Sequence, residues 1–162
     1  PKSLKEFENN PLFEKCAKNI PKDLFISVAA VSDWKVKSYF KNKIKKKDRQ
    51  ISFQLTKNRD ILKFISSHKK RPKLVVGFAA ETNDIEKNAK SKLKVKKCDL
   101  IIANKVSEKN GVMGGDVNSA YIFNNSCCLA TYKSMKKVDL SKKILTEVIF
   151  PILNKKIGEK IL

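Results

Sequence analysis

Three uninterrupted apolar runs constrain the fold of this chain more than any other feature. They cover residues 24–31 (LFISVAAV), 73–80 (KLVVGFAA) and 100–103 (LIIA). A strand with one solvent-exposed face alternates apolar and polar residues, whereas a strand that is covered on both faces is apolar throughout. Each run is far shorter than the roughly 20 residues of a membrane-spanning helix. The runs therefore predict three buried strands of a parallel sheet.

The segments that separate these runs have the periodicity of helices, and polar residues precede them at positions that suit helix caps. Asn58 is expected to cap a helix over the following apolar residues. Asn83 stands three residues before Glu86, a spacing that resembles a capping box. Asp139 is expected to cap the last helix, and Pro151 is expected to kink or end it.

Two further stretches predict an antiparallel hairpin around Asn124-Asn125, namely residues 120–123 and 127–131. Residues 34–50 are basic and aromatic without helical or strand periodicity, and they are expected to form a flexible flap. Strands that alternate with helices predict an α/β domain of Rossmann-like type, with a mainly parallel sheet flanked by helices and a C-terminal antiparallel hairpin. The 162 residues suit one compact domain, so residues 1–162 are expected to form a single domain.

The chain is strongly basic, with 36 Lys and Arg against 16 Asp and Glu and a net charge of +20. Such a surface attracts polyanions. The excess is spread along the chain and consists almost entirely of Lys, whereas proteins that read DNA sequence depend on the Arg fork. A general Lys bias accounts for the charge at least as well as nucleic-acid binding, and only residues 41–49 form a dense basic run.

The four cysteines show no CxxC spacing, and His68 is the only histidine, so no zinc site is expected and no residue is assigned as a metal ligand. Cys127 and Cys128 are adjacent in a predicted strand, where they would point to opposite faces and would not pair. We expect reduced thiols and a cytoplasmic protein. No signal peptide or long apolar segment is found, so no membrane contact is expected.

Ligands of open α/β sheets bind at the carboxyl ends of the strands, and unusual residues follow all three apolar runs. The first run ends in Ala29-Ala30 before Ser32-Asp33, the second in Ala79-Ala80-Glu81-Thr82, and the third in Asn104-Lys105. Small residues let a ligand approach the backbone, and a helix N-terminus offers N–H groups to an anion. Taken one at a time, tight helix-on-sheet packing and simple capping explain these residues equally well.

Taken together, the strand ends resemble a known family. The segments that carry the resemblance follow in order: VAAVSDW (28–34), KIKK (43–46), LTKNRDIL (55–62), VVGFAAET (75–82), KLKVKKCDLIIANKV (92–106) and GGDVNSAYIF (114–123). They are similar to the synthetase domain of bacterial phosphopantothenate–cysteine ligases, enzymes of coenzyme A biosynthesis. The resemblance extends from about Asp23 to the C-terminal helix.

The resemblance implies a two-step reaction. The carboxylate of 4′-phosphopantothenate attacks CTP to give an acyl-cytidylate and pyrophosphate, and the amine of cysteine then displaces CMP. Mg²⁺ bound with CTP is implied as the cofactor. Such catalysis needs mainly charge neutralisation and alignment of the reactants.

The lysines of the site are also implied by the resemblance. Lys43 matches the flap lysine that contacts the acyl-phosphate, and it is the expected catalytic residue; Lys45 lies beside it in the same flap. Lys92 and Lys96 match lysines that reach the triphosphate. They are four residues apart and so share one helix face, where like charges repel unless an anion is present. Solvated helix lysines are an alternative interpretation of both.

The remaining nucleotide-binding residues match positions around the base. Ala29, Ala30 and Phe78 would form a slot of small residues with one aromatic ring, and Asp33 matches a polar position on the nucleotide side. Asn104 would hydrogen-bond the base or a loop. Structural turn chemistry is an alternative for Asp33 and Asn104.

The chain also departs from the family pattern. The Gly-rich segment that opens the family's synthetase domain, and the flavin-binding decarboxylase domain often fused ahead of it, have no counterpart in these 162 residues. Arg59 stands where Pro is usual, and Val112-Met113 where Phe is usual. We therefore expect the C-terminal part of a ligase, with a fused or separate decarboxylase. The family also implies a homodimer.

Two other function classes remain open at this stage. A single-stranded nucleic-acid-binding module would use the basic run 41–49 with Trp34, Tyr39 and Phe40 as stacking aromatics. A catalytically silent dimerisation or regulatory domain would bind no nucleotide at all.

Overall fold

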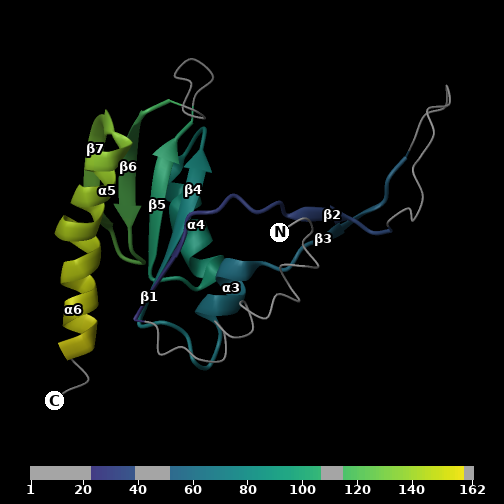
Figure 1. Cartoon of the computed structure of the whole chain (residues 1–162), viewed down its shortest axis with the longest axis horizontal. Helices are drawn as coiled ribbons and strands as arrows, with labels where there is room; N and C mark the ends of the chain where they lie inside the picture. Colours follow the sequence, from purple (N-terminus) through teal and green to yellow (C-terminus); the bar gives the residue numbers. More distant parts are fainter. Residues whose placement is uncertain (1–22, 39–51, 107–114, 159–162) are drawn as a thin grey trace.

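The computed structural model describes residues 23–38, 52–106 and 115–158. Their centre is a five-stranded sheet with the order β1-β4-β5-β6-β7, in which the first three strands are parallel and the last two are antiparallel (Figure 1). The predicted α/β class, Rossmann-like with a C-terminal hairpin, is confirmed. The strands of the sheet are β1 (Leu24–Ser27), β4 (Leu74–Glu81), β5 (Leu100–Lys105), β6 (Val117–Phe123) and β7 (Cys128–Lys136).

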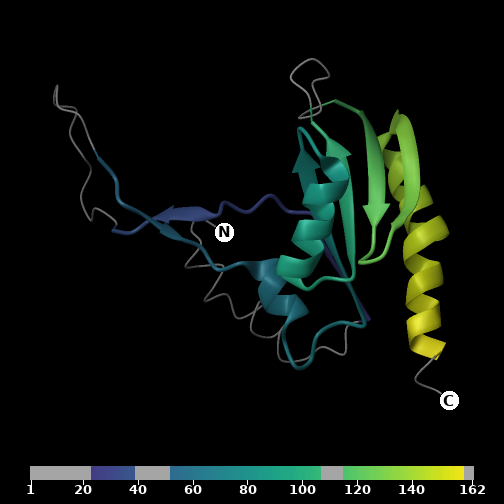
Figure 2. The ribbon, with the colours of Figure 1, turned by 180° about the vertical axis from the view of Figure 1, so that it is seen from behind.

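Helices cover both faces of the sheet, which explains why β4 and β5 are apolar throughout. Figure 2 shows α4 in front of one face, with the C-terminal helices on the other side. Even-numbered residues of β4 such as Leu74 and Val76 join one buried cluster with the C-terminal helices, and odd-numbered residues such as Val75 and Ala79 join a second cluster with α4. The helices are α3 (Ile61–Ser66), α4 (Ile85–Lys96), α5 (Lys137–Lys143), the π-helix η2 (Ile144–Ile149) and α6 (Phe150–Gly158).

A second, two-stranded sheet projects from the domain. It consists of β2 (Trp34–Val36) paired antiparallel with β3 (Leu55–Lys57), and Figures 1 and 2 show it extending away from the main sheet. We call this ribbon the arm. The segment 34–50 was expected to lack strand structure, so β2 is a correction: its regularity comes from pairing with β3, which periodicity within one strand does not reveal. Residues 39–50 of the predicted flap lie outside the described residues.

The helix caps differ from those predicted. Asp60 rather than Asn58 caps α3, with its Oδ1 accepting from the backbone N of Lys63. Asp84, in the left-handed conformation, precedes α4 and makes no side-chain cap bond. The expected capping box does not form, because the cap is Asp84 and not Asn83, which leaves Glu86 only two residues after it; Glu86 pairs with Lys90 at 2.7 Å.

The C-terminal helix also begins and continues differently from the prediction. Its first helical segment follows Lys136, so Asp139 lies in the first turn and is not the cap. The chain remains helical through Pro151, where a kink or an end was expected. The π-helix η2 precedes this proline, and Phe150 N donates to Leu145 O, five residues back. This wider turn accommodates a residue that has no N–H and would clash with a regular α-turn.

No helix among the described residues is long and apolar enough to cross a membrane.

Candidate functional site

The predicted base-binding residues lie at the carboxyl ends of neighbouring strands. Phe78 and Asn104 belong to β4 and β5, which are adjacent in the sheet, and Ala29-Ala30 directly follow β1 on the other side of β4. Strand β1 ends at Ser27, although the apolar run continues to residue 31. Ala29 and Ala30 are therefore exposed beyond the sheet and are not buried within it.

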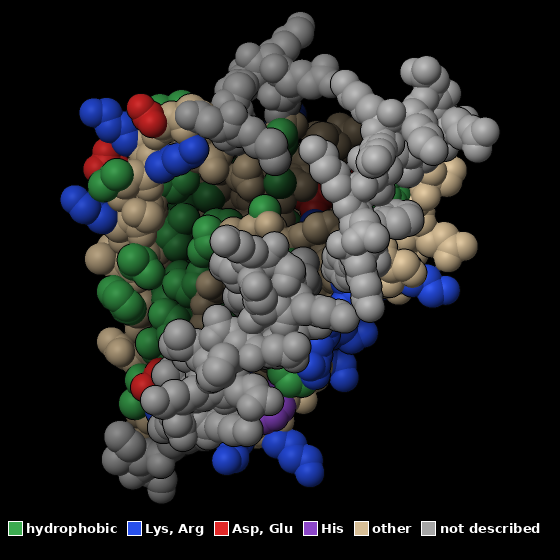
Figure 3. Space-filling view, turned by 45° about the vertical axis from the view of Figure 1, so that its right-hand side comes forward, with side chains coloured by type: hydrophobic (Ala, Val, Ile, Leu, Met, Phe, Trp, Pro, Cys, Tyr) green, Lys and Arg blue, Asp and Glu red, His purple; other side chains and the backbone are tan. Residues whose placement is uncertain are grey.

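Phe78 is unusual for a central strand because its ring is 41% exposed. Alternation along β4 and β5 places Phe78 and Asn104 on the same face as Leu74 and Ile102, which the C-terminal helices cover further down the strands. Figure 3 shows hydrophobic side chains in a recessed area beside those helices. An aromatic ring left open at a strand end is a suitable surface for a planar ligand.

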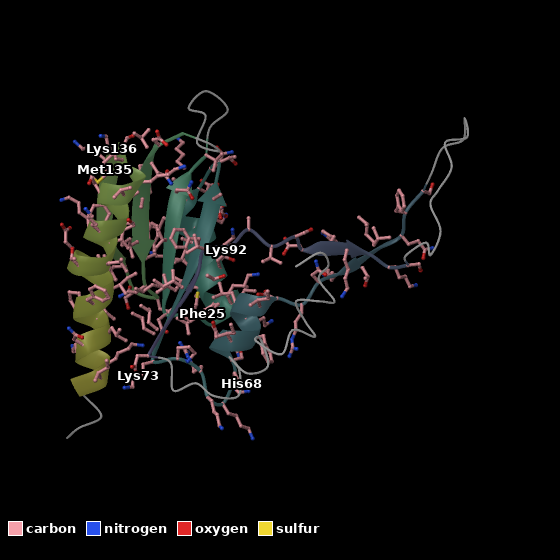
Figure 4. All side chains as sticks on the ribbon, in the orientation of Figure 1. Phe25, His68, Lys73, Lys92, Met135 and Lys136 are labelled. Carbon is pink, nitrogen blue, oxygen red and sulfur yellow. The ribbon has the colours of Figure 1, made fainter. Side chains whose placement is uncertain are left out.

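Lys92 lies on α4, and its ammonium is 2.7 Å from Oε1 of Glu81 at the end of β4. The side chain of Glu81 is only 12% exposed, and its other oxygen accepts from Nδ2 of Asn88 at 3.0 Å. Figure 4 shows Lys92 at the side of the sheet from which the arm leaves. Lys92 thus neutralises a largely buried carboxylate while 41% of its own side chain stays exposed.

Lys96 is held in the same manner by a carboxylate from another element. Its Nζ lies 2.6 Å from Oδ2 of Asp60, the residue that caps α3. Burial raises the pKa of Asp60, but the hydrogen bonds from Lys96 and from the backbone of Lys63, with the charges of both lysines, outweigh it and leave the pKa below 3.8. The carboxylate is therefore ionised at neutral pH and keeps Lys96 beside the start of α3.

The structure brings these residues together in two groups that lie on opposite sides of the sheet. Phe78 and Asn104 project from the face of the C-terminal helices, while Lys92 and Lys96 belong to the helix that covers the other face. Strand β4 joins the groups, because Phe78 and Glu81 lie three residues apart with opposite orientations. A single ligand that used both groups would have to pass around the carboxyl edge of β4.

Asp33 lies in an exposed loop between β1 and the arm, and this loop is bonded to the residue that follows β3. Asn58 donates its backbone N–H to Asp33 O at 2.8 Å and its Nδ2 to Ser32 O at 2.7 Å. The predicted polar residue therefore lies at the base of the arm.

The flap lysines Lys43 and Lys45 lie outside the described residues, as do Tyr39 and Phe40 of the alternative stacking surface. Trp34 is described and is 50% exposed, with the Nζ of Lys57 at 5.7 Å from its ring centroid.

A cavity of about 780 Å³ opens at the N-terminus of α4, and none of the predicted site residues that the structure describes lines it. It is bounded by residues 82–86, Lys105 and residues of the β6–β7 hairpin, including Tyr121 and Cys128. Glu86 and Lys90 face this flank of α4, whereas Lys92 and Lys96 face Glu81 and Asp60. The cavity and the paired lysines are therefore separate features.

The described cysteines are free, and no group of three or more His, Cys, Asp or Glu able to hold a metal ion occurs in the part of the chain that the structure describes. Cys98 is buried, and burial raises the pKa of its thiol to about 11, so the thiolate is not formed at neutral pH. Cys127 precedes β7, so only Cys128 of this pair lies in a strand.

Sequence reasoning missed the carboxylates that hold the two lysines. Glu81 and Asp60 were both inside recognised segments, but neither was assigned a role. Asp60 is 36 residues from Lys96, and no local pattern links residues at that separation. The available signal was chemical: lysines on one helix face beside strand ends need counter-charges.

The fold is that of an α/β domain with a mainly parallel sheet, in which polar and small residues follow the strands and lysines lie on the helix that follows β4. A family model, described as the C-terminal domain of DNA/pantothenate metabolism flavoproteins, matches residues 8–150. The chain belongs to this family.

Curated relatives agree with this assignment. The chain is 40% identical over 138 residues to the coenzyme A biosynthesis bifunctional protein CoaBC of Bacillus subtilis (strain 168), covering 85% of this chain and 33% of the relative. It is 38% identical over 137 residues to the protein of the same name from Haemophilus influenzae, covering 84% of this chain and 33% of the relative. The chain therefore spans about a third of the length of these curated relatives.

Solved structures share the fold. The C-terminal domain of a coenzyme A biosynthesis bifunctional protein CoaBC superposes with a TM-score of 0.64 at 23% identity, covering 88% of this chain and 61% of that one. A DNA/pantothenate metabolism flavoprotein from Streptococcus pneumoniae gives 0.63 at 18% identity, covering 89% of this chain and 69% of that one.

Proposed function

We propose that this chain acts in coenzyme A biosynthesis as the nucleotide-binding part of a phosphopantothenate–cysteine ligase. The reaction joins cysteine to 4′-phosphopantothenate through an acyl-cytidylate made from CTP. The observation that carries the proposal is the gathering of Ala29-Ala30, Phe78 and Asn104 at one edge of three parallel strands, with Lys92 and Lys96 on the helix that follows β4. The family, and the relatives that are named for coenzyme A biosynthesis, support the choice of a reaction in this pathway.

The lysines suit the phosphate end of the nucleotide. A carboxylate is a poor acyl donor, and its activation by a nucleoside triphosphate needs positive charge around the transferred and leaving phosphates. Lys92 and Lys96 each contact one carboxylate among the described residues, and an ammonium group has three N–H donors. Each lysine can therefore contact a phosphate oxygen while it keeps its ion pair.

Phe78 suits the base end, because its side chain is exposed on the face of the sheet opposite to that of α4 and its lysines. In this arrangement the nucleotide passes around the end of β4, with its base on one side and its phosphates on the other. Asn104 is the polar group on the base side that can accept and donate hydrogen bonds.

Mg²⁺ that arrives with a nucleotide keeps most of its ligands from phosphates and water, and it needs only one or two protein carboxylates. Asp33 fits this need, because it is exposed at the strand-end loop, whereas Glu81 and Asp60 are paired with lysines. When bound, the ion neutralises phosphate charge. Asp33 would hold it from the loop at the base of the arm.

The proposal is tested first by isothermal titration calorimetry of this chain with CTP and with ATP. We expect CTP to bind with a dissociation constant at or below about 1 mM, which corresponds to about 4 kcal/mol, and more tightly than ATP. Equal affinities would refute the preference for CTP. Absence of binding by both nucleotides would favour the silent dimerisation or regulatory domain instead.

Lys43 is tested separately, in the ligase with its remaining part supplied. Lys43→Ala should lower the rate of acyl-cytidylate turnover by about a hundredfold and leave CTP affinity nearly unchanged, because a flap lysine acts on the transferred group. Lys47→Ala, in the same basic run, is the matched control. Normal turnover by Lys43→Ala would exclude its catalytic role.

A further inference from the structure

Asn58 connects three parts of the molecule that are separate in the sequence. It directly follows β3, and its backbone N–H donates to Asp33 O at 2.8 Å, which extends the β2–β3 ladder by one step. Its side chain makes a further bond, from Nδ2 to Ser32 O at 2.7 Å. The two bonds fasten the loop that leaves β1 to the base of the arm.

The loop at the other end of these bonds is folded onto itself. Ser32 Oγ donates to Trp34 O at 2.8 Å, and Trp34 N lies 3.3 Å from Ser32 Oγ. The carbonyl of Ser32 is left for Asn58, and Asp33 lies between the two bonded residues. The bonds from Asn58 thereby fix the backbone of Ser32 and Asp33, and with it the position of the Asp33 side chain.

The same segment continues directly into the lysine pair. Two residues after Asn58, Asp60 caps α3 through Oδ1 and binds Lys96 through Oδ2 at 2.6 Å. The Asp33 loop and Lys96 are therefore connected through the three residues from Asn58 to Asp60.

The chemistry of this position requires an amide. Only the NH₂ group can donate to the carbonyl of Ser32, which fixes the orientation of the side chain. Its Oδ1 is buried and has no hydrogen-bond partner among the described residues. Asp at this position would place a second acceptor against the carbonyl of Ser32, and Ala would remove the bond.

We propose that Asn58 is a positioning residue that holds the Asp33 loop and the base of the arm in a fixed relation to Lys96. Its effect on nucleotide binding rests on the function proposed above, whereas its effect on the ordering of the loop does not. The experiment is chosen so that these two effects are measured independently.

The test compares Asn58→Ala and the isosteric Asn58→Asp with Asn124→Ala as the matched control. Asn124 Oδ1 accepts from the backbone of Ser126 at 2.8 Å and of Cys127 at 2.7 Å, so the control also loses a side chain that orders a turn, but in the β6–β7 hairpin. Each variant is studied by hydrogen–deuterium exchange without ligand, by thermal unfolding and by calorimetric titration with CTP.

We expect both Asn58 variants to speed amide exchange in residues 28–36 and to weaken CTP binding, each by about tenfold, while the control changes exchange only in its own hairpin. Unchanged exchange in residues 28–36 overturns the proposal whether or not CTP binds. Faster exchange with unchanged CTP affinity reduces Asn58 to a structural role and also overturns it. If the wild-type chain binds no CTP, the ligase proposal fails, and the exchange data alone decide whether Asn58 orders the loop.

Discussion

Two groups of basic and carboxylate side chains in this domain form the same kind of ion pair but in different surroundings. At the amino edge of the sheet, the carboxylate of Asp99 binds Arg71, Lys156 and the backbone N of Val75. We call these residues the amino-edge cluster. Along α4, Glu81 holds Lys92 and Asp60 holds Lys96, and we call these the α4 pairs.

The difference between them lies in how many elements each carboxylate joins. Asp99 ties the start of β4 and the start of β5 to α6, and Lys156 also donates to Lys73 O at 3.1 Å. Each cation of the amino-edge cluster thus has two acceptors, because Arg71 also donates to Lys97 O. Each lysine of the α4 pairs contacts one carboxylate in the described part of the chain and retains N–H donors for a ligand. The first group is suited to hold the fold together, and the second to bind an anion.

The strongest test of this contrast is Asp99→Asn. Removal of the carboxylate charge leaves Arg71 and Lys156 without a counter-charge in a site where the acid is 20% exposed. We expect the free energy of unfolding to fall by about 2–3 kcal/mol, measured by urea unfolding. CTP affinity of the folded molecules should not change. A loss below about 0.5 kcal/mol would show that the amino-edge cluster is no more structural than an ordinary surface pair.

Lys96→Met should produce the opposite result. It removes one charge from the α4 pairs and keeps the aliphatic stem, so we expect CTP affinity to fall by about tenfold in calorimetry. The free energy of unfolding should change by less than about 1 kcal/mol, because the side chains of both Lys96 and Asp60 are about a third exposed.

Lys94→Met is the matched control for this variant, because Lys94 lies in the same last turn of α4 and is exposed. It removes the same charge from the chain and should leave CTP affinity unchanged. An equal loss of affinity in both variants would assign the effect to net charge and would remove Lys96 from the site.

The smallest expected effect concerns acid. The pKa of Asp60 lies below 3.8 in the folded state, so its pairing with Lys96 contributes stability above pH 3.8, and this contribution is lost as the pH falls below that value. Asp60→Asn keeps the cap of α3, since Asn caps as well as Asp, but removes the charge. The free energy of unfolding of the wild type should exceed that of Asp60→Asn by less than about 1 kcal/mol at about pH 5, and this difference should shrink at about pH 3.

Urea unfolding of both proteins at the two pH values measures this difference. A gap that stays constant between them would show that the Asp60 charge does not stabilise the contact between α3 and α4.

The main sheet could be predicted because its signals are local. The apolar runs became β1, β4 and β5, and the stretches around Asn124-Asn125 became β6 and β7. Strand β2 could not be predicted, because it depends on pairing with β3 across the intervening flap. The capping errors have a similar cause: the side chain of Asn58 is already bonded to Ser32, 26 residues away.

In the candidate site, too, only the features with local signals could be predicted. Its strand-end residues and the lysines of α4 were recognised from short segments of sequence. The partners that hold those lysines, and the presence of Phe78 and Lys92 on opposite sides of the sheet, follow only from the packed structure.

By itself, the sequence determined which segments form the parallel strands, their order along the chain and the resemblance to a ligase domain, because hydrophobic periodicity and short motifs act over a few residues; β1, expected to be buried, is a half-buried edge strand. The tertiary structure alone decided which carboxylate meets which lysine, which residue caps each helix and how the arm is fastened at Asn58. The bonds Asn58–Ser32, Lys96–Asp60 and Lys156–Asp99 join residues 26, 36 and 57 positions apart, and such pairing arises only when the sheet and its helices pack together.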